Sequence, residues 1–563
     1  MAINLQSPGI KVTERDNVAT IAAAGTTTAG AVGEFSWGPI NAPQLVTSEN
    51  ELVKKFGKPS TSNNVDFLCA AGYLAYSSSQ YVTRVVGTGA LNAASGTALL
   101  IENDDAYEVA TLTGAGNWIA KYAGALGNSI QVVIATASTY DDASFDAYRS
   151  FFDAAPGTSD YAAAINGSND ELHVAVIDKD GKITGTPGTL LEKFEAVSKA
   201  SDARGIDGGT NYYVKVINQT SKYIRWGGHP EQAGGTNWGS EANGTTFVDG
   251  ALGDAIFDGA VDETLTGGAN GASVTDTELL AGLAQYASKE TISLDVLVCG
   301  RGGVTVANKA IEYAEARKDC VAVFSPASSD VVNNAGSEAA DIVTASASYT
   351  TSTYGVFDSN WKYTYDRYND VYVYVPCNPD VAGCMARVDQ NLEPWFSPAG
   401  YENGRILNAV RLAWNPNQTD RDTLYKVGIN PIFNQPGRGT ILFGDKTFTT
   451  KKTSMSRINV RRLFITLQSV IGDSANDVLF AQNDTTTRNT FRDVVSGYLR
   501  SVQGGRGITD YRVVCDETNN PEDVVNANEF ICDIFVRPTA SVNFIQLNFT
   551  SVSGSAAFAE IGG

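Results

Sequence analysis

Histidine is almost absent from this chain. Only two occur in 563 residues, His173 and His229. A Ser-His-Asp site needs a histidine beside an activated serine, and no GxSxG nucleophile elbow is present. We therefore expect neither histidine to be catalytic and interpret both as hydrogen-bonded or solvated surface side chains. HExxH, GxGxxG after a strand and EF-hand loops are missing too, so we expect no metal and no cofactor.

One stretch resembles a phosphate-binding loop but lacks the contiguous Gly-Lys-Thr that defines the motif. In Gly439–Thr447 the lysine does not follow the glycine directly, because Asp445 stands between Gly444 and Lys446. A carboxylate at that position repels phosphate, and the preceding Thr-Ile-Leu-Phe favours a strand. The segment therefore predicts a strand followed by a turn, and no bound nucleotide.

Basic residues and long apolar runs are also scarce. The chain has 41 Lys+Arg against 62 Asp+Glu, a formal net charge of −21. A chain this acidic is a poor partner for nucleic acid, whose affinity comes from neutralised phosphates. No apolar run approaches the roughly 20 residues that span a bilayer, so we expect no direct membrane contact. Met1–Asn17 lacks the apolar core of a signal peptide, which predicts synthesis in a cytoplasm.

Cysteine is sparse and odd in number. The seven cysteines form no CxxC pair, and several lie in apolar, strand-like runs such as Val296–Cys299. In a cytoplasmic protein this pattern favours buried free thiols over disulfides or zinc ligands.

Charge is distributed unevenly along the chain. Residues 91–272 carry 24 acidic and 10 basic residues, a net of −14, whereas residues 401–563 carry 16 and 17, a net of +1. The first segment is typical of a solvated outer domain, and the second of a domain packed among neighbours. Basic residues gather once, and this cluster is either a solvated face or a docking patch for an acidic partner. Its members are Lys446, Lys451, Lys452, Arg457, Arg461 and Arg462.

The order of apolar patterns predicts a mixed multidomain fold. Short β-like runs at 130–135, 172–177 and 212–217 indicate a mainly-β insertion. The strand–helix–strand order of 292–299, 306–317 and 320–324 indicates parallel pairing. Further predicted elements are strands at 29–33, 80–86, 371–375, 511–515, 530–536 and 541–552, a helix after Ser48 that ends at Gly57, and helices at 67–76, 381–388, 460–471 (capped by Asn459) and 491–502.

Several short motifs together resemble the tail sheath proteins of contractile-tailed phages, particularly the large T-even-like myoviruses. They lie in order over residues 1–90 and 359–550, and none lies in 91–272. The motifs are Ser7–Ile10, Phe35–Pro39, Phe56–Pro59, Ser359–Lys362, Tyr365–Asp370, Trp395–Gly400, Gly428–Pro431, Gly444–Thr447, Arg457–Phe464, Tyr511–Asp516 and Asn519–Asn520.

The resemblance implies a structural subunit of the virion tail, stacked in hexameric rings around an inner tube and assembled in the host cytoplasm. Its partners would be other copies of itself, the tube protein, and the baseplate and tail terminator proteins. It also implies an α/β core called subtilisin-like for its shape, without protease chemistry, and an α+β C-terminal domain. Two rivals remain: a sheath subunit of a non-phage contractile injection system, and a subtilisin-like hydrolase.

These observations combine into one domain hypothesis. We expect an N-terminal extended arm (1–20), the first part of the core sheath domain (21–90), an acidic mainly-β insertion (91–272), the α/β core (273–400), the C-terminal sheath domain (401–545) and a C-terminal arm (546–563). Alternating apolar residues in the two end segments predict strands that pair with adjacent subunits. Those residues are Ile3, Leu5, Ile10, Val12, Ile545, Leu547 and Phe549. The basic cluster would then face the inner tube.

Overall fold

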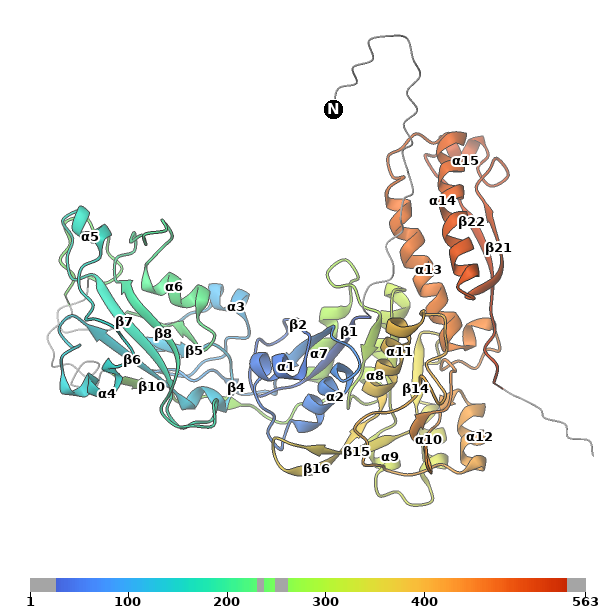
Figure 1. Ribbon diagram of the computed structural model, residues 1–563, viewed down its shortest axis with the longest axis horizontal. Coiled ribbons are helices and arrows are strands. Elements are labelled where there is room, and N and C mark those ends of the chain that lie inside the picture. Colours follow the sequence, from blue (N-terminus) through green and yellow to red (C-terminus); the bar gives the residue numbers. More distant parts are fainter. Residues whose placement is uncertain (1–26, 230–236, 249–261, 544–563) are drawn as a thin grey trace, which may run out of the picture. The chain divides into compact units, whose positions relative to one another are not determined.

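The computed structural model describes residues 27–229, 237–248 and 262–543 (Figure 1). The predicted arm strands, and the predicted last strand from residue 544 onward, lie outside these ranges. The described chain forms two compact units, a larger one within residues 27–391 and 398–456 and a smaller one of residues 392–397 and 457–543. The predicted domain boundaries remain predictions.

A seven-stranded sheet organises the larger unit. All its neighbours are parallel except the edge strand β2, which is antiparallel to β3. The predicted parallel pairing across helix α8 is confirmed, since Val296 pairs with Val321. In spatial order the strands are β18 (Ile429–Asn430), β14 (Gly355–Asp358), β13 (Val321–Phe324), β12 (Val296–Val298), β1 (Ala29–Glu34), β3 (Gln80–Val85) and β2 (Gln44–Val46).

Helices pack on both faces of this sheet. Helices α7 (Asp276–Leu283) and α8 (Val304–Arg317) contribute Leu279, Leu283 and Ile311 to the main core. Helices α2 (Asn64–Leu74) and α11 (Asn378–Asn391) contact each other and the sheet as well. The remaining helices of this part are α1 (Glu49–Phe56), η3 (Ala284–Tyr286), α9 (Ser328–Val331), α10 (Glu338–Ser346), α12 (Gln418–Lys426) and η4 (Ser454–Ser456).

Two small sheets complete this part of the unit. They are β16 (Val371–Pro376), β15 (Trp361–Asp366) and β17 (Arg411–Leu412), and the hairpin β19 (Ile432–Gln435) and β20 (Gly439–Leu442). Strand β20 confirms the predicted strand in the imitation phosphate loop.

Residues 91–268, which we call the insertion, lie in the chain between β3 and β12, and their described part contains a second sheet. Its antiparallel sheet has the order β10 (Asp262–Thr264), β6 (Ile130–Thr136), β7 (Glu171–Asp178) and β8 (Thr189–Ser198). Strands β4 (Ala90–Leu91) and β11 (Ala269–Asn270) pair where the chain enters and leaves this segment. The other elements are the pair β5 (Trp118–Ala120) and β9 (Ile224–Trp226), and the short helices α3 (Asp104–Val109), η1 (Ala125–Ser129), η2 (Ala143–Phe145), α4 (Asp146–Arg149), α5 (Asp160–Ala164) and α6 (Tyr213–Thr220).

The smaller unit consists of two long helices beside a β-hairpin (Figure 1). Its elements are α13 (Ile458–Asn476), α14 (Thr485–Gly504), β21 (Ile508–Val514), α15 (Glu522–Asn526) and β22 (Asp533–Pro538). Leu463 and Leu467 of α13 and Phe491 and Val495 of α14 form its core, against which the alternate residues of both strands pack. The two predicted helices, 460–471 and 491–502, and the two predicted strands, 511–515 and 530–536, are therefore present in this unit, with somewhat different bounds.

The structure corrects four local predictions. The run 212–217 is not a strand but the start of α6, in which Tyr213 and Ile217 are buried one helical turn apart. Asn459 is not the cap of α13; the cap position is Arg457, and the Asn459 amide donates to the Trp395 carbonyl. Residues 292–299 form a strand only at Val296–Val298.

The fourth correction concerns the cysteines. Five are buried free thiols, as predicted: Cys69, Cys299, Cys320, Cys377 and Cys384. Cys515 and Cys532 instead form a disulfide, with their Cα atoms 4.7 Å apart. The prediction failed because it rested on cellular compartment and spacing, whereas antiparallel pairing places these two positions directly opposite each other.

Candidate functional site

The carboxyl edge of the seven-stranded sheet is the place where open α/β sheets bind ligands. Here the first residue of α11 occupies that edge. The Asn378 amide donates to the Gly300 carbonyl and to Ser325 Oγ, and its oxygen accepts from the Gly300 amide. Ser325 Oγ in turn donates to Asp358 at 2.6 Å. These contacts connect the ends of β12, β13 and β14 to one another and direct the polar groups inward.

Asp358 is the member of this network whose pKa is shifted. Its side chain is fully buried, and burial raises its pKa to about 8. A serine and an aspartic acid are therefore in contact without a histidine between them. This arrangement stabilises the sheet edge and lacks the base that nucleophilic catalysis requires.

Ion pairs cross-link the same region. Arg301 follows β12 and binds Asp66 of α2 at 2.7 Å and Glu34 of β1 at 3.7 Å. Burial raises the pKa of both carboxyl groups, and the proximity of the two acids adds to this at Glu34. The guanidinium opposes both shifts, which indicates a structural clamp between β1, β12 and α2.

Neither histidine has a catalytic environment. His173 is buried rather than on the surface, which corrects the prediction. Its Nε2 lies 2.8 Å from the Ala154 carbonyl, its Nδ1 accepts from the Ala196 amide, and its ring stacks on Phe152. This pattern requires the neutral ring and uses both nitrogens. His229 is hydrogen-bonded to the Tyr213 hydroxyl, and burial lowers its pKa.

The imitation phosphate loop is engaged in internal contacts. The Tyr425 hydroxyl donates to Asp445, and Lys446 Nζ donates to the Tyr425 carbonyl while lying over its ring. The lysine is therefore held 4.0 Å from the centre of that ring. Within the described ranges, no three His, Cys, Asp or Glu side chains are arranged to hold a metal ion. No helix there is long and apolar enough to cross a membrane.

Three of the six predicted basic residues share one groove. Lys446, Lys451 and Lys452 line a depression of about 410 Å³, and Lys426, which sequence reasoning missed, joins them from the last turn of α12. We call it the lysine groove. Its lining includes Thr351, Thr449 and Thr450 but no carboxylate among the described residues. A lysine in the last turn of a helix is common, so only the fold could indicate that Lys426 belongs here.

The other three predicted basic residues belong to the smaller unit. Arg457 lies at the cap of α13, and Arg461 and Arg462 follow in its first two turns, where both are buried. The predicted patch thus consists of two groups on two units, and only the lysine group has been placed in a groove.

The smaller unit presents a different kind of surface. In the part of the chain that the structure describes, the hairpin β21–β22 is paired with no third strand at either outer edge. Its far face is exposed, and Phe535 is 60% accessible on it. Unpaired edges of this kind favour the addition of strands from another chain.

Buried polar groups that bind one another, together with unpaired strand edges, are features of a structural subunit that assembles with other chains. Family models match residues 273–448 as the phage tail sheath protein central domain, residues 450–551 as the phage tail sheath C-terminal domain, and residues 26–74 as the tail sheath protein Gp18 domain III N-terminal region.

Relatives with known names agree. The tail sheath protein of Enterobacteria phage T4 is 30% identical over the whole of both chains. That of Salmonella phage ViI is 28% identical over 99% of this chain and 97% of its own. That of Vibrio phage KVP40 is 40% identical, but over only 50% of this chain and 45% of its own length. The chain belongs to the phage tail sheath protein family, and it is a structural subunit of a contractile tail sheath.

Solved structures support the fold. The sheath tail protein of Listeria innocua superposes with a TM-score of 0.55 over 92% of this chain and 93% of its own, at 12% identity. The sheath tail protein of Desulfitobacterium hafniense superposes with a TM-score of 0.50 over 90% of this chain and 94% of its own, at 13% identity. The mixed α/β, multidomain architecture is therefore that of sheath proteins.

Proposed function

We propose that the chain polymerises as stacked hexameric rings around an inner tail tube, and that contraction of this sheath drives the tube through the host envelope during genome delivery. The full-length similarity to the T4 tail sheath protein carries this proposal. The protein would be assembled in the host cytoplasm and remain in the virion tail. Its partners are further copies of itself, the tube protein, and the baseplate and tail terminator proteins.

Co-expression with the tube protein of the same phage tests this directly. We expect sheathed tubes in negative-stain electron microscopy, with hexameric symmetry in end views. Bare tubes beside a monomeric protein would contradict the proposal.

The subunits are joined, in this proposal, by their two arms. The alternating residues Ile3, Leu5, Ile10 and Val12, and Ile545, Leu547 and Phe549, would add strands to neighbouring subunits. The outer edges of β21 and β22 could bind such strands, because within the described chain no third strand pairs with the main-chain groups at either edge. Such links persist while domains reorient, as contraction requires. Deleting residues 1–15 is expected to abolish long sheaths, and sheaths of normal length would contradict the arm proposal.

The basic residues are proposed to face the tube. The lysine groove, with four lysines and no carboxylate in its described lining, suits an acidic surface. Arg457, Arg461 and Arg462 form the second part of the proposed patch, on the other unit. No nucleic acid and no membrane is proposed to contact the subunit directly.

The energy of contraction would be stored in the assembled lattice, and we propose no enzymatic activity. The buried Ser325–Asp358 contact and the occupied histidine nitrogens support this view. The likeness of the α/β core to subtilisin would be one of shape alone, and the acidic insertion would lie on the outside of the sheath. Phage relatives across the full length favour a phage tail over a non-phage injection system, and neighbouring capsid and terminase genes would decide between them.

A further inference from the structure

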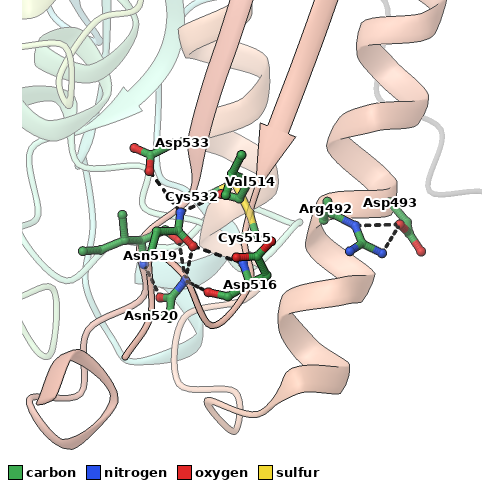
Figure 2. The surroundings of a disulfide bond; sticks show 10 residues. Arg492, Asp493, Val514, Cys515, Asp516, Asn519, Asn520, Cys532 and Asp533 are labelled. Carbon is green, nitrogen blue, oxygen red and sulfur yellow. Dashed lines mark hydrogen bonds and ion pairs between the residues drawn. A yellow bond between two sulfur atoms is a disulfide. The ribbon is translucent and has the colours of Figure 1, made fainter. Parts of the chain in front are cut away.

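A disulfide closes the hairpin of the smaller unit at its loop end. Cys515 follows β21 and Cys532 precedes β22, so the bond comes one position beyond the last strand pair, Val514 with Asp533 (Figure 2). The cross-link therefore lies in register with the ladder and bounds the loop of residues 516–531.

Hydrogen bonds hold this loop independently of the disulfide (Figure 2). Asn519 Nδ2 donates to the Val514 carbonyl at 2.7 Å and to Asp533, which joins the two strand ends. Asn520 makes a reciprocal pair with Ile531: its Nδ2 donates to the Ile531 carbonyl, and its Oδ1 accepts from the Ile531 amide, both at 2.8 Å. Amide side chains and the strand ladder therefore hold the two cysteines close together in addition to the covalent bond.

The remaining five cysteines have different surroundings. All are buried in the larger unit, and burial raises their pKa values, to about 12 at Cys299 and Cys384. A buried thiol with a raised pKa supplies little thiolate and reacts slowly. Cys532 is partly exposed, whereas Cys515 is 1% exposed. What distinguishes these two cysteines is their proximity, with Cα atoms 4.7 Å apart, and the partial exposure of one member.

We propose that Cys515 and Cys532 are an oxidation site that is reduced while the subunit folds and polymerises, and that is cross-linked by a low-molecular-weight disulfide once particles leave the reducing cell. The Cys532 thiolate attacks one sulfur of the small disulfide, forms a mixed disulfide and releases one small thiolate. The Cys515 thiol then loses its proton to water, attacks the Cys532 sulfur and displaces the second small thiolate. Two electrons pass to the small disulfide, which leaves as two thiols, and the protein gains one S–S bond.

The consequence concerns the strand ladder. Closing a loop of this size removes conformations from the opened hairpin, which raises the free energy of opening β21–β22. This step rests on the proposed function, in which the hairpin accepts arm strands from neighbouring subunits. The cross-link would then stabilise strand pairs between subunits that have already formed. It would then act after assembly and would not be needed for assembly.

Thiol trapping tests the oxidation itself. Cells producing the full-length protein are quenched in acid and alkylated, and particles or purified subunits are alkylated after incubation with oxidised glutathione. We expect two alkylated cysteines in the 515–532 peptides from cells and none after incubation. A pair already oxidised inside reducing cells, or still reduced after oxidised glutathione, would overturn the proposal. This readout does not depend on polymerisation, so its failure is distinct from failure of the proposed function.

Variants test what the cross-link does. Cys515→Ser/Cys532→Ser is expected to assemble like the unaltered protein, while amide hydrogen exchange over 508–538 becomes faster by roughly a hundredfold. Dithiothreitol should produce the same acceleration in the unaltered protein and none in the variant. Asn520→Ala should slow oxidation by glutathione disulfide, because the loop that aligns the cysteines is loosened. Equal exchange rates with and without dithiothreitol would overturn the proposal.

Discussion

Lys362 and Asp380 form an ion pair in the interior of the larger unit. Their nitrogen and oxygen lie 2.8 Å apart, and their side chains are 5% and 1% exposed. The Tyr76 hydroxyl donates to the same oxygen at 2.9 Å and itself accepts from the Leu407 amide. Strand β15, helix α11 and the turn after α2 therefore meet at one charged contact. Its lysine is the last residue of the stretch Ser359–Lys362, which carries the family resemblance.

Replacing Lys362 with Met should destabilise the larger unit strongly. The buried Asp380 carboxylate would lose its counter-charge, and an uncompensated buried charge typically costs about 3–5 kcal/mol. Urea unfolding followed by tryptophan fluorescence measures the change. Lys309→Met is a matched control, because it breaks an exposed pair with Glu312 and should leave the midpoint unchanged. Equal midpoints for the two variants would contradict the prediction.

Asp358 should make stability fall as pH rises. Its pKa is about 8 in the folded chain, against the ordinary value of 3.8 for an aspartate, so between these values the folded state retains a proton that the unfolded state has lost. Each pH unit in this window then costs roughly 1 kcal/mol. We would measure melting temperatures from pH 5 to 9. As the pH rises to about 8, the melting temperature of Asp358→Asn should increase relative to that of the unaltered protein. The other carboxyl groups are the same in both proteins and cancel in this comparison. A difference in melting temperature that does not change with pH would contradict the raised pKa of Asp358.

Two facing helices offer a paired test of packing. A Cβ at Gly383 of α11 would lie 2.4 Å from the Tyr76 ring, whereas one at Gly72 of α2 would lie 3.6 Å from its nearest neighbour, Pro379. Gly383→Ala should therefore destabilise the protein by about 1–3 kcal/mol through overpacking. Gly72→Ala should be neutral or gain up to about 1 kcal/mol from helix propensity. Thermal unfolding of the two variants side by side provides the measurement.

Charge reversal in the lysine groove should impair assembly on tubes. Lys451 and Lys452 are exposed there, so replacing both with Glu changes the groove by four charges without disturbing a core. We expect at least a tenfold loss of sheathed tubes in electron micrographs of co-expressed protein. Lys215→Glu/Lys222→Glu makes the same charge change in the insertion and should assemble normally. Similar losses from both variants would indicate a general charge effect and contradict a specific groove.

Local structure could be predicted where single residues determine it. Ser48 and Gly57 bound α1 as expected, with the Ser48 side chain accepting from the Glu51 amide. The helix predicted at 491–502 ends close to its predicted end, since α14 stops at Gly504 with Gly505 as its cap. These signals lie within one helical turn, so the sequence alone contains them.

Nonlocal arrangements were beyond such reasoning. A short apolar run such as 212–217 fits both a strand and a helix, and its burial in the insertion decides in favour of α6. The lysine groove requires α12 to approach the loop after β20, which no local pattern indicates. The same holds for Cys515 and Cys532, which meet only because two distant strands pair in one register.

The two-stranded stem β4–β11 holds the two ends of the insertion together. Ala90 pairs with Asn270 and Leu91 with Ala269, so the segment between them begins and ends at neighbouring points. The segment also contacts the main sheet beyond the stem, since Arg84 of β3 donates to the Ala123 carbonyl. Residues gained or lost away from these contacts need not displace β3 or β12, so an engineer could graft a foreign cargo domain there.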